Sequence, residues 1–403
     1  MLSSCSPAFR LMLATSWLAT ESWRAHQDRA IRSCLSCSMD WEQYLVLIKR
    51  HGTPAVSCEA LNRVPDINLP AAVRQALQQR SYACRIQAMR FASLLMQVLK
   101  DFNEAGIPLI PLKGPLLSLA LYGDLGTRHS LDIDIMASLD DMPTAQGRLE
   151  QMGWQVHLRP TFGPRHTDVF LKIYHHLVYW HPLHRCILEL HWRTRWETPD
   201  HTTGQWARSA AFVWEGLSYR SLSPVDLALH LCEHGSGHAW FRLKWLGDLA
   251  RMYAMGYVDW DAAYRTACTM GAENSLLQCL RLLEELHGLP VPETLRAQAA
   301  RLPAELVERP AACMLAPPEA HRTMRQLRYE RLLRPHRSWR QALTEVAYSS
   351  ADFELLHLPD RLFWIYLPLR PFLLIWRWIR HAGVKPHAEV AAAIANHSDE
   401  KLQ

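Results

Sequence analysis

The chain has 403 residues, of which 49% are hydrophobic and 21% are charged, and its formal net charge is +5. This composition is ordinary for a folded globular protein with room for two or three domains, and it excludes a low-complexity chain. The charge is too modest to argue for nucleic acid as a partner.

Cysteine usage and the N-terminus bear on the cellular compartment. Cys34 and Cys37 form the one Cys-x-x-Cys pair of the sequence, and no second pair stands at zinc-finger spacing, so we interpret both as reduced helix cysteines. The apolar patch from Leu11 to Ala19 has no basic start, and Glu21 and Arg24 follow it closely. This pattern is not typical of a secretory signal, and we expect a cytoplasmic protein.

Helical periodicity dominates the first 102 residues, which end in a long amphipathic segment from about Ala71 to Phe102. We predict a helical N-terminal region over 1–102, a core of alternating strands and helices over 103–215, a helical C-terminal domain over 216–330 and a tail over 331–403. Within the core, the expected strands are 107–112, 154–158, 170–180 and 186–192, the last two as a hairpin, and the expected helices are 115–122 and 140–152. The predicted fold class is α+β.

The most informative stretch is Leu131-Asp132-Ile133-Asp134-Ile135. Side chains alternate faces on a strand, so Asp132 and Asp134 point the same way. A third carboxylate is available at Glu189, a lone acid in an apolar strand that is costly to bury unless it is paired or binds a metal. Carboxylates on one strand face, with a glycine turn nearby, are what a metal-dependent phosphoryl-transfer site needs.

The glycine turn precedes this acidic strand. Pro115 suits the first position of a helix, and backbone N–H groups at Gly114 and the helix start can face a phosphate.

Two basic residues stand close to these motifs. Lys113 either touches phosphate or is a solvated loop lysine, and we favour the second interpretation. Arg128 either contacts a phosphate through its bidentate fork or forms an ion pair that orders Asp132 or Asp124.

The order Lys-Gly, then Asp-x-Asp, then an isolated acid on a later strand resembles the polymerase-beta-like nucleotidyltransferase superfamily. More narrowly, the chain resembles a bacterial family of uncharacterised nucleotidyltransferases over roughly residues 20–330. The segments that carry the likeness are Leu112-Lys113-Gly114, Leu121-Tyr122, Arg128, Asp132-Ile133-Asp134, Glu189-Leu190-His191-Trp192 and the stretch from His230 to Asp248. The resemblance implies an α+β core, with a small mixed sheet and helices, flanked by N- and C-terminal helical regions.

The resemblance also implies a reaction, the transfer of NMP from an NTP to a hydroxyl of a small molecule, glycan, peptide or protein. By position, the Mg²⁺ or Mn²⁺ ligands are Asp132, Asp134 and Glu189, and the nucleotide contacts are Lys113, Gly114 and Arg128. One departure is Pro115, which lacks the N–H that many superfamily members have after the glycine. Two alternatives stay open: a non-catalytic scaffold of this fold at the membrane, which the missing donor at Pro115 supports, and a kinase-like phosphotransferase that uses the same metals.

Histidines form a further pattern in the helical half. His230, His234 and His238 are spaced four apart and share a helix face, which permits a zinc site. The alternatives are packing against Trp240 and Trp245, pairing with buried acids, or contact with the base or acceptor across the cleft. His191, on the face of Glu189, is a candidate for orienting the metal ligands or for a general base.

The tail combines arginines with aromatic residues. A series at three-residue spacing spirals around a helix that we expect to break near Pro335; it comprises Arg322, Arg325, Arg328, Arg331, Arg334, Arg337 and Arg340. This series is either a solvated basic helix or an anion-binding surface. The segment from Arg361 to Arg380 is too often interrupted by arginine to span a bilayer, but it suits the headgroup boundary of an anionic membrane, and the alternative is a helix packed on the protein body.

Overall fold

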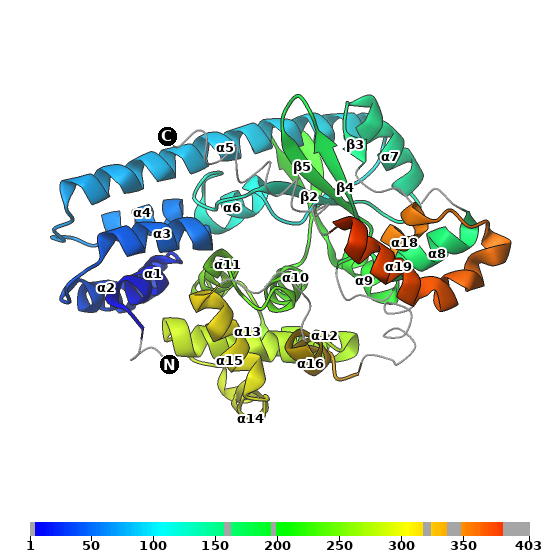
Figure 1. The fold of residues 1–403 in the computed structure, drawn as a ribbon. Helices are drawn as coiled ribbons and strands as arrows, with labels where there is room; N and C mark the ends of the chain where they lie inside the picture. The colour runs from blue at the N-terminus through cyan, green and yellow to red at the C-terminus, as the bar shows by residue number, and fades with distance from the viewer. Residues whose placement is uncertain (1–4, 157–162, 195–198, 317–323, 337–347, 382–403) are drawn as a thin grey trace.

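The computed structural model describes residues 5–156, 163–194, 199–316, 324–336 and 348–381 (Figure 1). Over these residues a small mixed sheet and a two-stranded hairpin are set among helices that come from both ends of the chain. The predicted α+β class is confirmed.

A five-stranded sheet carries the predicted acidic residues. Its strands are β1 Ile110–Pro111, β2 Asp132–Met136, β3 Gln155–Val156, β4 His176–His181 and β5 Cys186–His191. They lie in the order β1-β2-β5-β4-β3, with β2 and β5 parallel and the other neighbours antiparallel. The predicted hairpin of the last two strands is therefore confirmed. A second sheet is the hairpin of β6 Ala210–Trp214 and β7 Leu217–Ser221.

Helices precede, interrupt and follow the strands. Those before and among the strands are α1 Pro7–Thr15, α2 Glu21–Leu35, α3 Trp41–His51, α4 Pro54–Asn62, α5 Ala71–Glu104, α6 Pro115–Tyr122, α7 Met142–Gln151, α8 Pro164–Ile173 and α9 Pro199–Arg208. Those after them are α10 Pro224–Gly237, α11 Leu243–Ala254, α12 Trp260–Met270, α13 Glu273–His287, α14 Arg296–Ala300, α15 Glu305–Leu315, α16 Met324–Leu333, α18 Ser350–Leu355 and α19 Tyr366–His381, with the 3₁₀ turns η2 Glu293–Leu295 and η3 Asp360–Ile365.

Helices from the two ends of the chain share one hydrophobic core. Leu11 of α1 and Tyr44 of α3 are buried in the same cluster as Leu246 of α11 and Leu280 of α13. Burying apolar side chains is the main favourable contribution to folding. The regions expected at 1–102 and 216–330 therefore pack against each other.

The 34-residue helix α5 joins this shared core to the sheet. Val73 and Leu77, near its start, belong to the shared helical core, whereas Phe91, Leu95 and Phe102 pack with residues of the sheet. In Figure 1, α5 runs along the top of the molecule, and α10 and α11 lie below the sheet. The predicted long amphipathic segment is confirmed.

One predicted strand is wrong over part of its length. Residues 170–173, expected to open a strand over 170–180, end helix α8, and β4 begins only at His176. Pro164 occupies the start of this helix, where a proline is well tolerated. Phe170 stacks on Tyr174 with 4.6 Å between ring centroids, and a helical turn brings residues four apart together.

Other predicted boundaries shift. The strand expected over 107–112 shrinks to β1, because Pro108 and Pro111 lack the N–H that a sheet ladder needs. The boundary at 215/216 falls in the turn of the β6–β7 hairpin, where Glu215 and Gly216 both have positive φ. The strand expected over 154–158 is β3 at 155–156, and residues 157 and 158 lie outside the described part of the chain.

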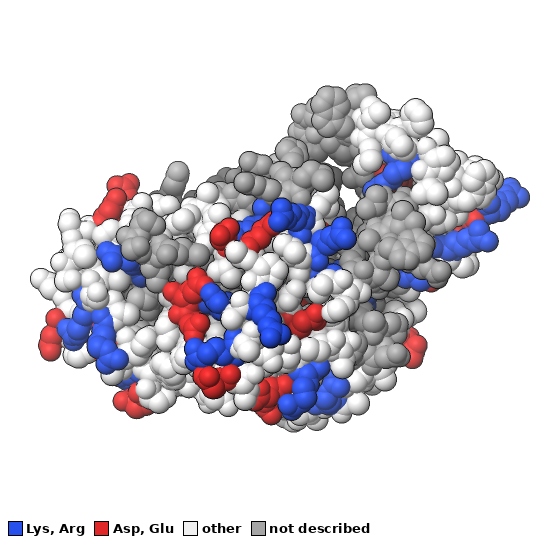
Figure 2. Space-filling model, turned by 90° about the horizontal axis from the view of Figure 1, so that it is seen from below, with Lys and Arg blue, Asp and Glu red and all other residues white. Residues whose placement is uncertain are grey.

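The arginine series lies partly on α16, which ends before Pro335 as expected. The side chain of Arg328 is 76% exposed, and its Nε lies 2.8 Å from Oε2 of Glu305 on α15. The side chains of Arg322, Arg325, Arg337 and Arg340 lie outside the described part of the chain. Figure 2 shows positive and negative side chains interspersed on the face seen from below.

The aromatic tail leaves apolar side chains in contact with water. Trp364 of η3 is 62% exposed, and Phe372 and Ile375 of α19 are 67% and 56% exposed. Tyr366 and Leu373 instead pack inward against a small aromatic cluster. Among the described residues, no helix combines the length and apolarity that crossing a bilayer requires. Contact with an anionic membrane surface stays a prediction.

The shared helical core should make the protein sensitive to acid. His51 of α3 is fully buried, its Nδ1 accepts a hydrogen bond from the Leu243 N–H at 3.2 Å, and burial lowers its pKa to about 3. An unfolded histidine titrates at about 6.5, so stability present above that pH is lost as the pH falls toward 3. In His51→Asn the amide oxygen can replace Nδ1 as acceptor but does not titrate. We expect the free energy of unfolding of this variant to fall by about 2 kcal/mol less than that of wild type between pH 7 and pH 5. Urea unfolding at both pH values, with His184→Asn as control, measures this difference, and equal losses would contradict it.

Candidate active site

The parallel pairing of β2 and β5 brings acidic residues of two strands together. In the register of this pair, Asp134 lies opposite Glu189, and Asp132 lies opposite Ile187. Ile133 and Leu188 point to the other face, where both are buried in the core. Because faces alternate along each strand, the three carboxylates share one face of the sheet.

Lys113 lies inside this site. Its side chain is 7% exposed, and its Nζ stands 3.0 Å from Oδ1 of Asp134 and 3.3 Å from Nδ1 of His234. The expectation of a solvated loop lysine is therefore wrong. The Leu112 N–H donates to the Asp134 carbonyl, and this bond holds the turn that carries Lys113 against β2. Burial alone would lower the pKa of Lys113, but the charge of Asp134 and the other two carboxylates outweighs burial and raises it.

Two histidines from the paired ends of β4 and β5 flank Glu189. His191 Nε2 lies 3.2 Å from Glu189 Oε2 and 3.5 Å from Asp134 Oδ1. Burial would lower the pKa of His191, but its contacts with these two carboxylates outweigh burial and raise it. His176 Nε2 is farther away, at 3.9 Å from Glu189 Oε1, and burial lowers its pKa to about 4.

The pKa values of the two aspartates of β2 are shifted in opposite directions. Burial and the charge of Asp134 raise the pKa of Asp132 to about 6, and Lys113 offsets only part of this rise. Burial would also raise the pKa of Asp134, but the charges of Lys113 and His191 hold it well below its usual range. Negative charge is therefore in excess at Asp132, and a bound cation would offset it.

The donor set fits a divalent cation. Both carboxylate oxygens of Asp134 are buried, and neither makes a hydrogen bond of good geometry. One oxygen of Asp134, one of Glu189 and one ring nitrogen of His191 lie within 4.8 Å of one another. Asp132 shares the face but stands outside this convergent group. Carboxylate oxygens are the ligands that Mg²⁺ and Mn²⁺ prefer, so the two acids of the group are suited to such an ion.

The turn before α6 depends on a glycine. Gly114 has φ +82° and ψ −151°, a backbone conformation that residues other than glycine rarely adopt. A Cβ built there would meet nothing nearer than the Asp132 carbonyl oxygen at 4.0 Å, so space is open beside this turn at the start of β2. Pro115 occupies the first position of α6, as expected.

Arg128 pairs with neither of its expected partners, Asp132 or Asp124. Its Nε donates to Oδ2 of Asp248 on α11 at 2.7 Å, and one of its terminal nitrogens donates to Ser130 Oγ at 3.2 Å. Both members of the ion pair are at most 4% exposed. Burial would lower the pKa of Arg128, but the charge of Asp248 outweighs burial and raises it. The pair fastens the loop before β2 to the helical half of the molecule.

Helix α11 and the turn before it supply two cations that the sequence motifs did not reveal. Lys244 is 9% exposed, and its Nζ donates to the His129 carbonyl at 3.3 Å. Burial, with the charge of Arg128, lowers the pKa of Lys244 to about 7, although Asp132 acts in the opposite direction. Burial also lowers the pKa of Arg242, and the charge of Asp132 acts in the opposite direction. The one signal for these residues was their position inside the family-like stretch from His230 to Asp248.

The three histidines at helical spacing do not gather their nitrogens. Among the described residues, the sets of ligand atoms close enough for one metal do not include His230, His234 and His238 together. The rings of His234 and His238 pack on Trp245, with centroids 5.0 and 5.2 Å away. The packing interpretation is confirmed for these two, and His234 also meets Lys113 over the acidic site.

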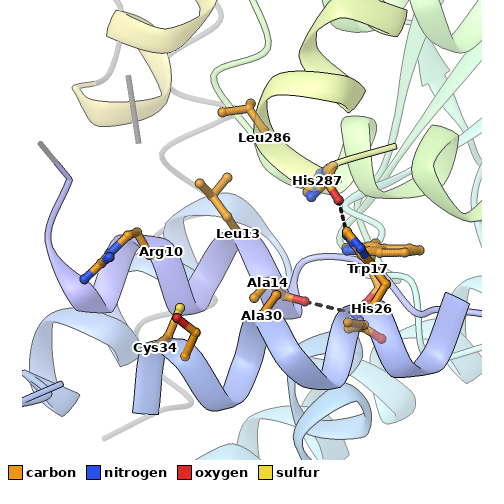
Figure 3. A pocket seen from close by; sticks show the side chains of 11 residues that line it. Arg10, Leu13, Ala14, Trp17, His26, Ala30, Cys34, Leu286 and His287 are labelled. Atoms are coloured by element: carbon orange, nitrogen blue, oxygen red, sulfur yellow. Dashed lines mark hydrogen bonds between the residues drawn. The ribbon is translucent and has the colours of Figure 1, made fainter. Parts of the chain in front are cut away.

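A cavity of about 170 Å³ lies apart from this site, between α1, α2 and α13 (Figure 3). Its walls include Leu13, Trp17 and Cys34, and His26 Nε2 on one side donates to the His287 carbonyl at 2.8 Å. None of the predicted site residues lines it.

Removing Asp248 should destabilise the fold, because Arg128 would stay buried without its partner carboxylate. We expect Asp248→Ala to lower the free energy of unfolding by about 3–5 kcal/mol, measured by urea denaturation. The exposed Asp140 serves as control, and Asp140→Ala should change this free energy by less than about 0.5 kcal/mol. A loss below about 1 kcal/mol for Asp248→Ala would show that the pair is dispensable.

Comparison with known families gives one finding. A family described as uncharacterised nucleotidyltransferases matches residues 38–288, more than half of the chain. The match is shorter at both ends than the expected span of 20–330, and it includes Asp132, Asp134, Glu189 and Lys244. No curated protein and no solved structure matches. As its motifs predicted, the chain belongs to this family of uncharacterised nucleotidyltransferases.

Proposed function

We propose that this chain is a metal-dependent nucleotidyltransferase, which transfers NMP from an NTP to a hydroxyl of a small-molecule, glycan, peptide or protein acceptor and releases pyrophosphate. The observation that carries the proposal is the register of β2 and β5, which sets Asp134 against Glu189 with Asp132 on the same face. Carboxylates held in this way suit the divalent ions that accompany nucleotide phosphates. Family membership supports the same class of reaction.

In this proposal the acidic residues of the sheet bind the metal. Asp132, Asp134 and Glu189 would hold Mg²⁺ or Mn²⁺, which when bound supplies Lewis-acid stabilisation of the phosphate oxygens and activates the acceptor hydroxyl. Lys113 keeps Asp134 ionised in the absence of the cation, through the 3.0 Å ion pair. His191 keeps Glu189 aligned through the 3.2 Å hydrogen bond. These contacts lower the cost of holding charged carboxylates in a buried site.

The nucleotide phosphates have a separate set of partners. In this proposal the triphosphate lies between the open backbone of Gly114 and the cations Lys244 and Arg242. These two cations offset the backbone donor that Pro115 removes from the turn. Arg128 is held by Asp248, and it acts by positioning the loop that leads into β2.

Two alternatives predict different products. A kinase-like phosphotransferase on the same metals leaves a nucleoside diphosphate, whereas nucleotidyl transfer releases pyrophosphate. A non-catalytic scaffold of this fold, at the membrane or elsewhere, does neither. Assaying reactions with candidate acceptors for pyrophosphate and for nucleoside diphosphate distinguishes the three functions.

Loss of the acidic pair on β2 should abolish nucleotide binding. We expect calorimetric titration with NTP and Mg²⁺ or Mn²⁺ to give metal-dependent binding for wild type, and none for the Asp132→Asn/Asp134→Asn variant, because two neutral amides bind the cation far more weakly than two carboxylates. Asp140→Asn is the matched control, since Asp140 is exposed in the loop after β2. Absence of binding in a well-folded wild type, or full binding in the double variant, would count against the proposal.

Lys244 should matter for the nucleotide more than for the fold. Lys244→Met keeps the length of the buried side chain but removes its charge, so we expect about a tenfold rise in the Kd for NTP, or about 1.4 kcal/mol, with little change in the unfolding temperature. Lys100→Met, at an exposed position on α5, should leave the Kd unchanged. An unchanged Kd for Lys244→Met would remove Lys244 from the phosphate site.

A further inference from the structure

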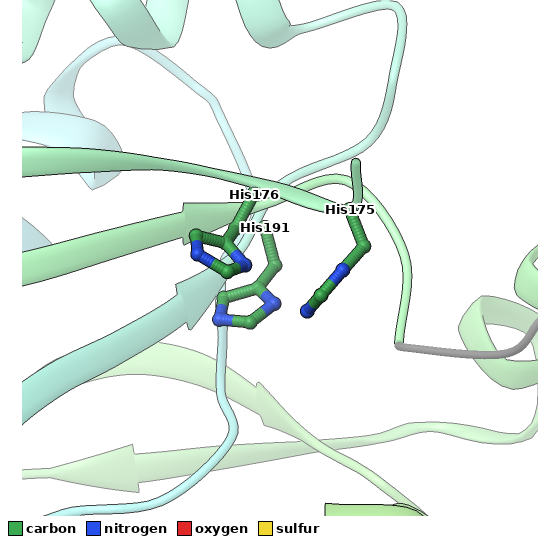
Figure 4. A group of neighbouring side chains, drawn as sticks. All are labelled: His175, His176 and His191. Atoms are coloured by element: carbon green, nitrogen blue, oxygen red, sulfur yellow. The ribbon is translucent and has the colours of Figure 1, made fainter. Parts of the chain in front are cut away.

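A second convergence of side chains lies at the joined ends of β4 and β5. His176, the first residue of β4, is paired in register with His191, the last residue of β5. Residues paired in this way carry their side chains on the same face. His175 precedes the strand, and its carbonyl accepts from the Trp192 N–H at 3.1 Å. Figure 4 shows the three imidazole rings gathered on one side of this hairpin end.

The spacing of the rings suits a shared ligand. One ring nitrogen of each histidine lies within 4.8 Å of one nitrogen of each of the other two. The ring centroids are 4.4 Å apart for His175 and His176, 4.9 Å for His176 and His191, and 5.6 Å for His175 and His191. Metal–nitrogen bonds of about 2.0–2.1 Å set two nitrogens on a tetrahedral ion about 3.3 Å apart. Small side-chain rotations would therefore close the set.

His191 already has the environment of a metal-bound imidazole. A ligating histidine usually donates its other ring N–H to a carboxylate, which fixes the tautomer. Glu189 and Asp134 are in place to accept from Nε2 of His191, at 3.2 and 3.5 Å. In the neutral ring the lone pair then lies on Nδ1, which is buried and makes no hydrogen bond.

His176 faces the same carboxylate from a distance too long for a hydrogen bond. Its Nε2 lies 3.9 Å from Glu189, and its Nδ1 is also buried without a hydrogen bond. Two buried imidazole nitrogens without partners are costly at one place in a fold unless a ligand satisfies them.

We propose that His175, His176 and His191 form a binding site for one divalent transition metal ion of the zinc class. Imidazole nitrogen suits Zn²⁺, Co²⁺, Ni²⁺ and Cu²⁺, whereas Mg²⁺ takes oxygen ligands. Three protein nitrogens leave a fourth position of a tetrahedral ion for water or another ligand.

This site does not rest on the proposed transfer reaction, because its ligands are three ring nitrogens, whereas the proposed Mg²⁺ or Mn²⁺ ligands are the carboxylates Asp132, Asp134 and Glu189. His191 nevertheless belongs to both surroundings, since its Nε2 faces Glu189 and Asp134. An ion on Nδ1 would hold the imidazole ring still, and with it the alignment of the two carboxylates. The histidine site would thus bias the acidic site through a single side chain.

The test uses Co²⁺ as probe on the full chain after chelator treatment. Co²⁺ held by three nitrogens in a four-coordinate site gives visible d–d absorption, which hydrated Co²⁺ gives only weakly. We expect one equivalent of Co²⁺ to produce these bands and Zn²⁺ to displace them. His175→Ala and His176→Ala should each weaken binding by about tenfold or more. His184→Ala, in the turn of the same hairpin, is the matched control and should leave the bands unchanged.

Asp132→Asn separates the two sites. It should keep the Co²⁺ bands while it abolishes metal-dependent NTP binding, so the failure of either proposal is visible without the other. Circular dichroism establishes that each variant is folded. A folded wild type without bands, bands that survive both His175→Ala and His176→Ala, or bands lost in Asp132→Asn would each overturn the histidine site.

Discussion

Three carboxylates on one face of a small sheet, Asp134 buried and Asp132 and Glu189 half-buried, are the constraint on which the rest of the site depends. An ionised carboxylate taken out of water is costly unless opposite charge or hydrogen bonds compensate it. Asp134 has Lys113 from the preceding turn and His191 from β5 as partners. Asp132 has less compensation, and burial raises its pKa to about 6. The ion pairs around Asp134 and the cation expected at Asp132 both compensate the negative charge of these carboxylates.

The helical parts of the chain are therefore components of the site. Lys113 lies between Asp134 and His234 of α10, and the loop before β2 is tied through Arg128 to Asp248 of α11. These two helices in turn pack in the core that α1 and α3 complete. Through this shared core, α1 and α3 support the helices that cover the site.

Strand alternation was enough to place Asp132 and Asp134 on one face, because that property depends on local backbone geometry alone. The parallel register that sets Asp134 against Glu189 depends on two segments far apart in the chain, and no local pattern encodes it. The burial of Lys113 and the pairing of Arg128 with Asp248 were missed for the same reason. The strand expected over 170–180 was partly wrong because a short apolar run suits a helix as well as a strand, and residues 170–173 end the helix that begins at Pro164.

The single helix α5 serves two hydrophobic cores, one near each of its ends. An α-helix turns by about 100° and rises by about 1.5 Å for each residue. One residue inserted between Leu77 and Phe91 would therefore rotate the contact surface of one core away from its partners while the other stayed in place. An insertion of about seven residues would restore the helical phase but would still move the two contact surfaces about 10 Å apart. The length of this one helix thus sets the distance between the two cores, so even positions whose side chains face water are constrained in number.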